Sequence, residues 1–158
     1  MIGRLHHVVL DSPDPGALAE FYSVLLGQPI TYRSDDWVVV AADDSSSGLA
    51  FQLAPGHRRP TWPDPAVPQQ FHLDIMVEDV AVAGPRVLAL GATKLDGDGV
   101  YADPAGHPFC LIPRPGWAPP IPDDDHGPIC RLWRGQGHPT GGEAGFDDGG
   151  QLLGNRIE

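Results

Sequence analysis

The sequence predicts an α+β fold in which one unit of strand, helix and three strands occurs twice within residues 1–113. The main observation is a repeated spacing: His7 stands seven residues before Asp14. His72 and Asp79 repeat that spacing 65 positions later. Each aspartate precedes an apolar stretch with helical spacing, and each copy closes on a Phe-x-Leu triplet. This ordered set of signals predicts an internal duplication around a single small-molecule pocket.

Both helices are predicted from their ends as well as from their periodicity. An aspartate directly before a helix accepts hydrogen bonds from the first backbone amides, which lack a partner within the helix. A glycine after the last apolar residue is typical of a helix C-terminus. These signals predict helices over residues 17–26, before Gly27, and about 80–90, before Gly91. Pro85 lies inside the second range and lacks an amide donor, so it should kink or delay that helix.

Three short strand-like segments follow each helix. They cover residues 29–32, 37–41 and 49–53 in the first copy, and 92–95, 100–102 and 109–112 in the second. A proline-rich linker over residues 54–68 separates the copies. The predicted domain therefore covers residues 1–113, with modules at 4–54 and 69–113.

The composition changes after Pro113. Residues 114–158 hold 10 of the 20 glycines and 6 of the 18 prolines, without a helical or strand period. Such a segment buries too little apolar surface to offset the entropy that it would lose on ordering. We therefore expect residues 114–158 to form a Gly/Pro-rich, disordered tail outside the domain.

The charge of the chain restricts its partners. A net charge of -11 at pH 7 repels phosphate backbones and anionic lipid surfaces, so we expect no nucleic-acid or membrane partner. No apolar run reaches the length of a membrane-spanning helix. The first residues lack a signal-peptide layout, and two cysteines do not imply a disulfide framework. These features predict a cytoplasmic protein.

Strand alternation places polar side chains on one face of each sheet, because successive residues of a strand point to opposite faces. With the apolar positions packed on the helices, His7 and Gln52 of the first copy fall on the other face. His72 and Cys110 occupy equivalent places in the second copy, and Asp74 shares their face. Two tryptophans could add apolar walls. We therefore predict a ligand cavity lined by His7, Trp37, Gln52, Trp62, His72, Asp74 and Cys110.

Two of these residues have more specific expected roles. Trp62 lies in the linker, where a mobile loop could close over a ligand. Asp74 is the one catalytic candidate, and its role is open. It could act as a base or orient a ring nitrogen of His72, or it could instead pair with Arg58 or Arg59.

Three stretches resemble the glyoxalase/bleomycin-resistance/extradiol-dioxygenase superfamily, also called vicinal oxygen chelate (VOC) proteins, in its glyoxalase-like branch. They are HHVVLDSPDPGALAEFYSVLLG, PTWPDPAVPQQFHLDIMVEDV and VYADPAGHPFCLIPRP, and they span nearly all of residues 1–113. The resemblance implies two βαβββ modules whose curved mixed sheets form one cleft, with both helices outside. The segment DPAGHPFCL corresponds to the turn before the last strand, so His107 is expected in a turn. The resemblance is specific for a fold and only weakly for an activity.

The resemblance also implies where a metal would bind. In metal-using members of the superfamily the ligands, typically His and Glu, come from the first and last strands of each module. The corresponding positions are His7, Gln52, His72 and Cys110, so both histidines are present and both carboxylates are missing. Glyoxalase-type isomerisation needs a carboxylate base, and a ring-cleaving dioxygenase holds Fe(II) with two histidines and one carboxylate. We therefore expect neither activity, and zinc is the metal that best suits a site containing Cys110.

Two functions remain open. One is an enzyme-like protein that binds a small organic molecule in the cleft, with metal-assisted isomerase, lyase or oxygenase-like chemistry. The other is a non-catalytic protein that sequesters an antibiotic or metabolite, as antibiotic-resistance members of such families do. An acidic surface would suit a cationic ligand in that case. The linker is also long enough for modules to be exchanged between the subunits of a homodimer.

Overall fold

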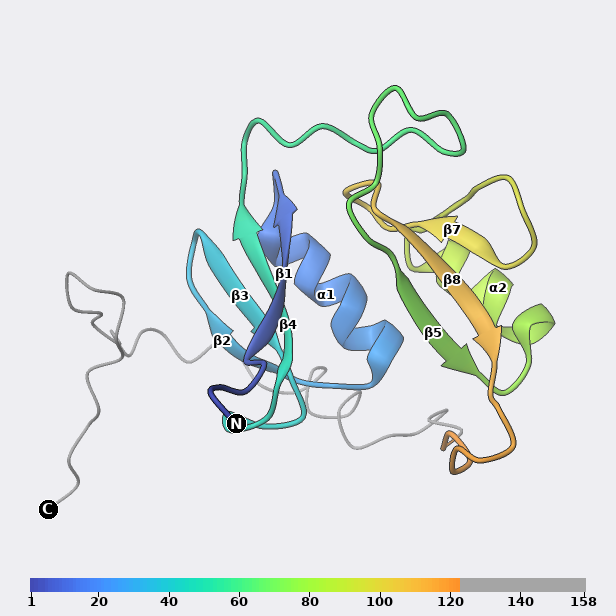
Figure 1. Cartoon of the computed structure of the whole chain (residues 1–158), viewed down its shortest axis with the longest axis horizontal. Helices are drawn as coiled ribbons and strands as arrows, with labels where there is room; N and C mark the ends of the chain where they lie inside the picture. Colours follow the sequence, from blue (N-terminus) through green and yellow to red (C-terminus); the bar gives the residue numbers. More distant parts are fainter. Residues whose placement is uncertain (123–158) are drawn as a thin grey trace, which may run out of the picture.

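The computed structural model describes residues 1–122, which form two mixed four-stranded sheets, one in each module (Figure 1). The first module consists of β1 (His7–Ser12), α1 (Pro15–Leu26), β2 (Ile30–Arg33), β3 (Trp37–Val40) and β4 (Gly48–Leu53). The second repeats that order with β5 (Leu73–Val77), α2 (Val80–Ala89), β6 (Thr93–Lys94), β7 (Val100–Ala102) and β8 (Pro108–Pro113). The predicted α+β fold with two βαβββ modules is confirmed.

Strand order is the same in both sheets. The first strand of each module pairs in parallel with the last, giving the orders β1-β4-β3-β2 and β5-β8-β7-β6. The remaining pairs are antiparallel. The parallel registers set Asp11 opposite Gln52 in the first sheet and Asp74 opposite Cys110 in the second. In each sheet a polar pair therefore lies on the two parallel strands.

Both helices begin at the aspartates that the sequence singles out. Asp14 Oδ1 accepts a hydrogen bond from the Ala17 amide at 2.9 Å. Asp79 Oδ1 accepts from the amides of Ala81 at 2.7 Å and Val82 at 3.3 Å. Each carboxylate thus satisfies backbone donors that the helix itself cannot pair.

The helix ends differ slightly from the predicted ones. α1 begins at Pro15, two residues earlier than predicted, since proline is well suited to the first helical turn. It ends at Gly27, whose φ of 63° is a left-handed conformation that glycine adopts at little cost. α2 continues through Pro85 to Ala89. Among the described residues, neither helix is long and apolar enough to cross a membrane.

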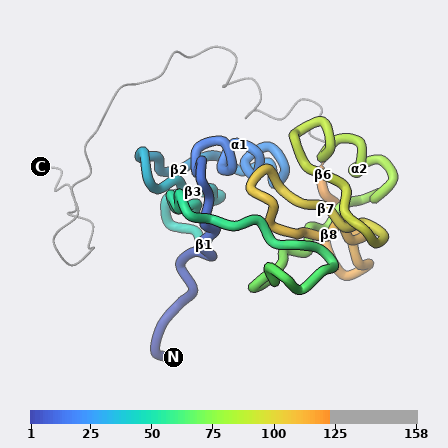
Figure 2. The backbone as a smooth tube through the Cα atoms, turned by 90° about the horizontal axis from the view of Figure 1, so that it is seen from above, coloured from blue at the N-terminus to red at the C-terminus, as the bar shows by residue number. Residues whose placement is uncertain are grey.

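One apolar core joins the two modules. Phe21 of α1 packs edge-on against Phe109 of β8, with ring centroids 6.0 Å apart. Tyr22 of α1 stacks on Phe51 of β4 at 5.4 Å, and Tyr101 of β7 stacks on Phe109 at 5.8 Å. α1 therefore lies at the junction of the modules, whereas α2 lies toward the outer side of the second one (Figures 1 and 2). Each fully buried aromatic side chain contributes about 1.5–3 kcal/mol, so α1 is a main contributor to holding the modules together.

Alternation along the strands separates this core from an outer face. Leu10, Phe51 and Phe109 are buried in the shared core. Their strand neighbours point the other way: Val9 is 40% exposed, and Gln52 is exposed as well. The outer face of the first sheet is thus exposed at these two positions, whereas Val39 and Ala50 on the same face are buried.

The linker folds onto the second module. Trp62 Nε1 donates a hydrogen bond to the Asp96 carbonyl oxygen at 2.8 Å, and Arg59 Nη2 donates to the Pro104 carbonyl oxygen at 2.6 Å. In Figure 1 the linker passes from the end of β4 to the start of β5 along one end of the two sheets. It therefore bridges the modules at that end.

Residues 114–122, which the sequence assigns to the tail, contact the second module. Arg114 Nε donates to Glu78 Oε1 at 2.7 Å, and the Ile121 amide donates to the same oxygen at 2.6 Å. Ala118 is buried. The rest of the predicted tail, residues 123–158, lies outside the described residues.

Candidate functional site

A hollow of about 460 Å³ lies between the two modules, beside the linker. Strands β1 and β4 line it from the first module, and the segments leading into β5 and β8 line it from the second. Linker residues close it on a further side. Its volume falls within the range of about 300–1,000 Å³ that is usual for small-molecule sites.

The lining of the hollow combines apolar walls with a few polar groups. Val9, Phe71 and several prolines supply the apolar part. Asp11 and Arg58 bring opposite charges to the same space. The other polar side chains are Gln52, His57, Gln69, Gln70 and His107. Such a mixture is typical of sites in which apolar contacts supply affinity and polar groups fix orientation.

Gln69 lines the hollow and carries an unsatisfied acceptor inside the protein. Its Oε1 atom is buried and has no hydrogen-bond donor among the described residues. A buried polar atom without a partner costs about 1–3 kcal/mol of stability.

Asp103, in the turn between β7 and β8, is almost completely buried, with 1% of its surface exposed. Three donors meet at its carboxylate. The Tyr22 hydroxyl donates to Oδ2 at 3.0 Å, and the His107 amide donates to Oδ1 at 2.9 Å. The third donor is His107 Nδ1, which lies 2.9 Å from Oδ2. Burial, and then the Asp103 charge, raise the pKa of Tyr22 well above 10, so this hydroxyl keeps its proton and donates.

The contact with Asp103 determines which tautomer of His107 is present. A carboxylate only accepts hydrogen bonds, so Nδ1 carries the ring proton, and Nε2 of the neutral ring is an acceptor. The His107 side chain is 15% exposed and lines the hollow. The ring of His57 packs beside it, with centroids 4.7 Å apart. His57 Nε2 lies 3.1 Å from the Ala105 carbonyl oxygen, so in the neutral ring that nitrogen is the donor.

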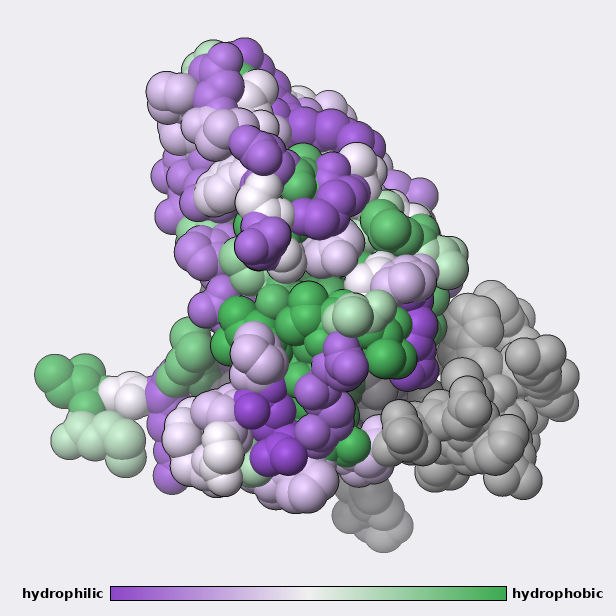
Figure 3. Space-filling model, turned by 90° about the vertical axis from the view of Figure 1, so that its right-hand side faces the viewer, coloured by the Kyte–Doolittle hydropathy of each residue, from purple (hydrophilic) through white to green (hydrophobic). Residues whose placement is uncertain are grey.

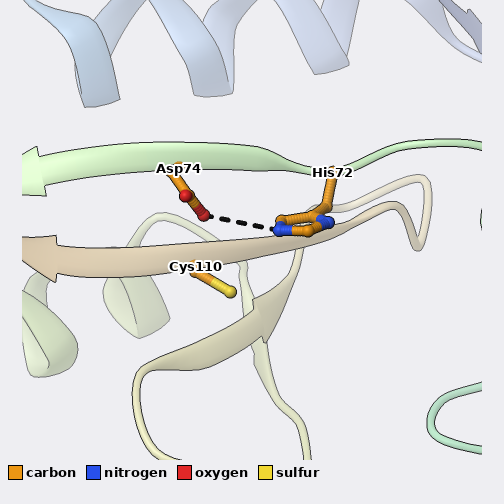
Figure 4. Close-up of side chains that lie close together, drawn as sticks. All are labelled: His72, Asp74 and Cys110. Carbon is orange, nitrogen blue, oxygen red and sulfur yellow. Dashed lines mark ion pairs between the residues drawn. The ribbon is translucent and has the colours of Figure 1, made fainter.

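A second polar cluster lies on the outer face of the second sheet (Figure 4). It consists of His72, directly before β5, Asp74 of β5 and Cys110 of β8. His72 Nε2 and Asp74 Oδ1 are 3.5 Å apart, and one potential ligand atom from each of the three residues lies within 4.8 Å of the others. Figure 4 shows the three side chains on the side of these strands that faces away from α1. We call these residues the outer-face cluster.

The outer-face cluster is only partly buried. The His72 and Asp74 side chains are 44% and 53% exposed, so solvent weakens the attraction between them. Burial raises the pKa of the Cys110 thiol, and the nearby Asp74 charge raises it further, whereas Lys94 lowers it. Without a metal, Cys110 therefore holds its proton at neutral pH.

Some of the cavity residues expected from the sequence lie in the hollow or in the outer-face cluster. Gln52 lines the hollow. The outer-face cluster brings together His72, Asp74 and Cys110. Asp74 therefore contacts a ring nitrogen of His72, which is one of the two arrangements left open by the sequence.

The other three expected cavity residues lie elsewhere. His7 stacks beside His6, with ring centroids 3.7 Å apart, and is neither in the hollow nor in the outer-face cluster. Partial burial, and then the neighbouring His6, lower the pKa of His7. Trp37 packs with Val39 on the outer face of the first sheet. Trp62 lies in the linker as predicted, and its indole is bonded to the loop after β6.

Few of the polar residues that line the hollow could be predicted from the sequence. His57, Arg58 and Gln69 lie in or directly after the linker, where no periodicity assigns a side chain to a face. Asp103 and His107 were expected only to form a turn. The spacing of these two residues does indicate their contact. An aspartate followed four residues later by a histidine in a tight turn brings the two side chains together.

Comparison with known proteins agrees with this architecture. The family model of the glyoxalase-like domain matches residues 7–112. A glyoxalase/bleomycin resistance protein/dioxygenase family enzyme from Burkholderia phytofirmans PsJN has a similar structure, with a TM-score of 0.52 and 19% identity over 70% of this chain and 98% of its own. Among curated proteins, no sequence relative is found.

Two further solved structures have the same fold. A glyoxalase-related enzyme from Fulvimarina pelagi gives a TM-score of 0.54 at 22% identity, over 78% of this chain and 95% of its own. A possible glyoxalase from Bacillus cereus gives 0.51 at 17% identity, over 71% and 99%. At these identities the likeness concerns the fold alone. The family match covers more than half of the sequence, and the chain therefore belongs to the glyoxalase-like domain family of the VOC superfamily.

Proposed function

We propose that this protein binds a small organic molecule in the hollow between its two modules. The observation that supports the proposal most directly is the composition of the lining, to which both modules and the linker contribute. A site assembled from both modules accounts for the linker being fixed to the second module by Arg59 and Trp62.

A thermal-shift screen tests this proposal. Binding to the folded state raises the unfolding temperature, and the rise grows with the logarithm of ligand concentration over Kd. The probes are phenols, other aromatic metabolites and cationic glycopeptides. We expect a hit whose shift decreases in Gln69→Leu and is retained in Gln28→Leu, a matched change outside the hollow. If no probe shifts the transition, or if the shift is the same in Gln69→Leu, the proposal fails.

Gln69→Leu has a second use in the same experiment. The substitution removes a buried acceptor that has no partner and keeps a side chain of similar size. The ligand-free variant should therefore be at least as stable as the wild type. A loss of ligand response without a loss of stability then identifies an effect on binding.

The outer-face cluster supports a second candidate function, in which a metal assists the chemistry. Histidine nitrogen, cysteine sulfur and carboxylate oxygen together suit zinc, and three protein donors leave one position open for a ligand. The residues fit such an ion if it replaces the Cys110 proton that burial and Asp74 favour. Zinc held there would polarise a bound oxygen atom, which is the chemistry of isomerase- or lyase-type enzymes. This metal-dependent function would use the outer-face cluster and not the hollow.

Non-catalytic sequestration is the alternative that the net charge of -11 favours, because an acidic protein attracts cationic ligands. Recovery of the bound compound distinguishes the two functions. A cationic glycopeptide that binds tightly and is recovered unchanged indicates sequestration. Conversion of the ligand on incubation indicates an enzyme.

The proposed partner protein is a second copy of this chain. The side of the molecule seen in Figure 3 carries a band of apolar surface between polar regions. On α2, Val82 is 60% exposed and Leu88 is 43% exposed. Exposed apolar patches of this kind often mark protein contacts. Sedimentation of the full chain should show a dimer that Val82→Glu weakens, and a monomer at all concentrations would contradict it.

A further inference from the structure

We propose that His107 Nε2 is the proton-accepting atom of the hollow, and that its ligand is a small apolar molecule with an acidic O–H group, such as a phenol or an enol. This inference rests on the proposed binding of a small molecule in the hollow. It adds which atom reacts with that molecule and which chemical class the hollow takes. It does not involve the outer-face cluster.

Asp103 sets the orientation of the His107 ring. Asp103 engages Nδ1 through Oδ2 at 2.9 Å and Oδ1 at 3.2 Å, so the ring proton lies on that side. Nε2 has no hydrogen-bond partner among the described residues. A lone pair on a residue that lines the hollow is thereby available to a ligand.

Proton transfer from the ligand would place a positive charge on the His107 ring. When the ligand donates its proton, its O–H bond breaks, an N–H bond forms at Nε2, and the ring becomes an imidazolium. The buried Asp103 carboxylate lies against that ring and compensates its charge. Tyr22 holds the carboxylate from the other side at 3.0 Å. The other titratable group beside the ring is His57.

The lining of the hollow indicates which chemical class of ligand it takes. Loss of the proton leaves an oxyanion, and the Arg58 guanidinium lines the same hollow. Val9 and Phe71 supply apolar contacts for the rest of the molecule. A hydroxylated aromatic compound or an enol combines these properties.

The tautomer of His107 can be measured without any ligand. In the full chain labelled with ¹⁵N, long-range nitrogen–proton correlation spectra at mildly alkaline pH should show the proton of His107 on Nδ1. Asp103→Asn should move the ring toward the Nε2-protonated form, a change that a merely structural role of Asp103 would not require. An Nε2-protonated ring in the wild type would overturn the proposal, whatever the stability of the variant.

The proton transfer can be followed with 4-nitrophenol, whose anion absorbs visible light. At a pH where the free probe is mainly protonated, addition of the wild-type protein should produce the phenolate band. In His107→Gln the phenolate band should be at least tenfold weaker. His6 is an exposed histidine outside the hollow, so His6→Gln should keep the full band. The fraction of bound probe is measured separately by equilibrium dialysis.

The outcomes separate this inference from the proposed function. Binding of 4-nitrophenol without a phenolate band, or with a band that His107→Gln leaves intact, overturns the role of His107 and leaves the binding site standing. Absence of 4-nitrophenol binding while another class of compound binds overturns the ligand class proposed here. Absence of binding by every compound in the thermal-shift screen counts against the proposed function itself.

Discussion

The Tyr22 hydroxyl donates a hydrogen bond of 3.0 Å to Asp103 Oδ2, across 81 positions of the chain. Tyr22 belongs to α1 of the first module, and Asp103 belongs to the turn before β8 of the second. The same carboxylate holds the amide and ring of His107. One buried bond therefore links the packing between the modules to the orientation of a side chain in the hollow.

Removing this bond should destabilise the protein. Tyr22→Phe leaves a buried carboxylate with one donor fewer, which we expect to lower the free energy of unfolding by about 1–3 kcal/mol. Urea denaturation measures the change. Tyr101→Phe is the matched control, because its ring is buried in the same core and its hydroxyl makes no hydrogen bond within the described residues. The free energy of unfolding of the control should stay within about 0.5 kcal/mol of the wild-type value. Equal effects of the two substitutions would contradict the role given to the Tyr22–Asp103 bond.

The contact between the linker and the turn should depend on a glycine. Gly106 has a φ of 97°, and a Cβ atom added there would lie 2.7 Å from Arg59 Cγ and 2.9 Å from Arg59 Cβ. Gly106→Ala should therefore displace Arg59 from the Pro104 carbonyl. We expect it to lower the free energy of unfolding by about 1–3 kcal/mol. Gly56→Ala in the same linker meets no atom within 4 Å and should have little effect. Chemical denaturation of both variants tests the difference, and unchanged stability of Gly106→Ala would show that the linker contact is not constrained there.

Zinc binding should distinguish the outer-face cluster from the ligand positions that the family resemblance implies. Protein purified without an affinity tag is titrated with Zn²⁺ in a calorimeter. We expect binding that weakens at least tenfold in His72→Asn and in Cys110→Ser, because each removes one of three donors. His7→Asn should bind as the wild type does, since His7 lies outside the cluster. Loss of binding in His7→Asn would instead support a metal shared by the two modules.

The stability of the protein should depend on the protonation of His7. Partial burial, and then His6, lower the pKa of His7 below its ordinary value of 6.5. Near and just below pH 6.5 the unfolded chain therefore binds more protons than the folded one. The free energy of unfolding then rises with pH through that window and falls on acidification. Denaturation at several pH values between about 5 and 7 should show a smaller slope in His7→Asn. A His7 pKa at or above 6.5 in an NMR titration would rule this contribution out.

Local features of the fold were predictable because local physical chemistry produces them. Asp14 and Asp79 cap helices through amides only two or three residues away. Phe51 and Phe109 fall on the core face because side chains alternate along a strand. The repeat and the family resemblance predict two modules with curved mixed sheets, whereas the strand order and the parallel pairing come from the structure.

The site was harder to predict because it depends on contacts between distant segments. The packing of α1 on the second module brings Tyr22 to Asp103, and nothing near either residue in the sequence indicates it. The path of the linker decides that Gln69 and His57 line the hollow. Face alternation assigns His7, His72 and Cys110 to the non-core face of their sheets, but it cannot give the distance between two sheets. In the structure His72 and Cys110 lie in the outer-face cluster, and His7 lies outside it.

A chemical-shift map of the full chain with 4-nitrophenol tests the binding site most directly. If the ligand binds between the modules, the residues that shift should come from both of them and from the linker. They should include Gln52, the Gln69 side-chain amide and His107, while the outer-face cluster stays unchanged. Shifts confined to the outer-face cluster, or to one module alone, would contradict a site between the modules.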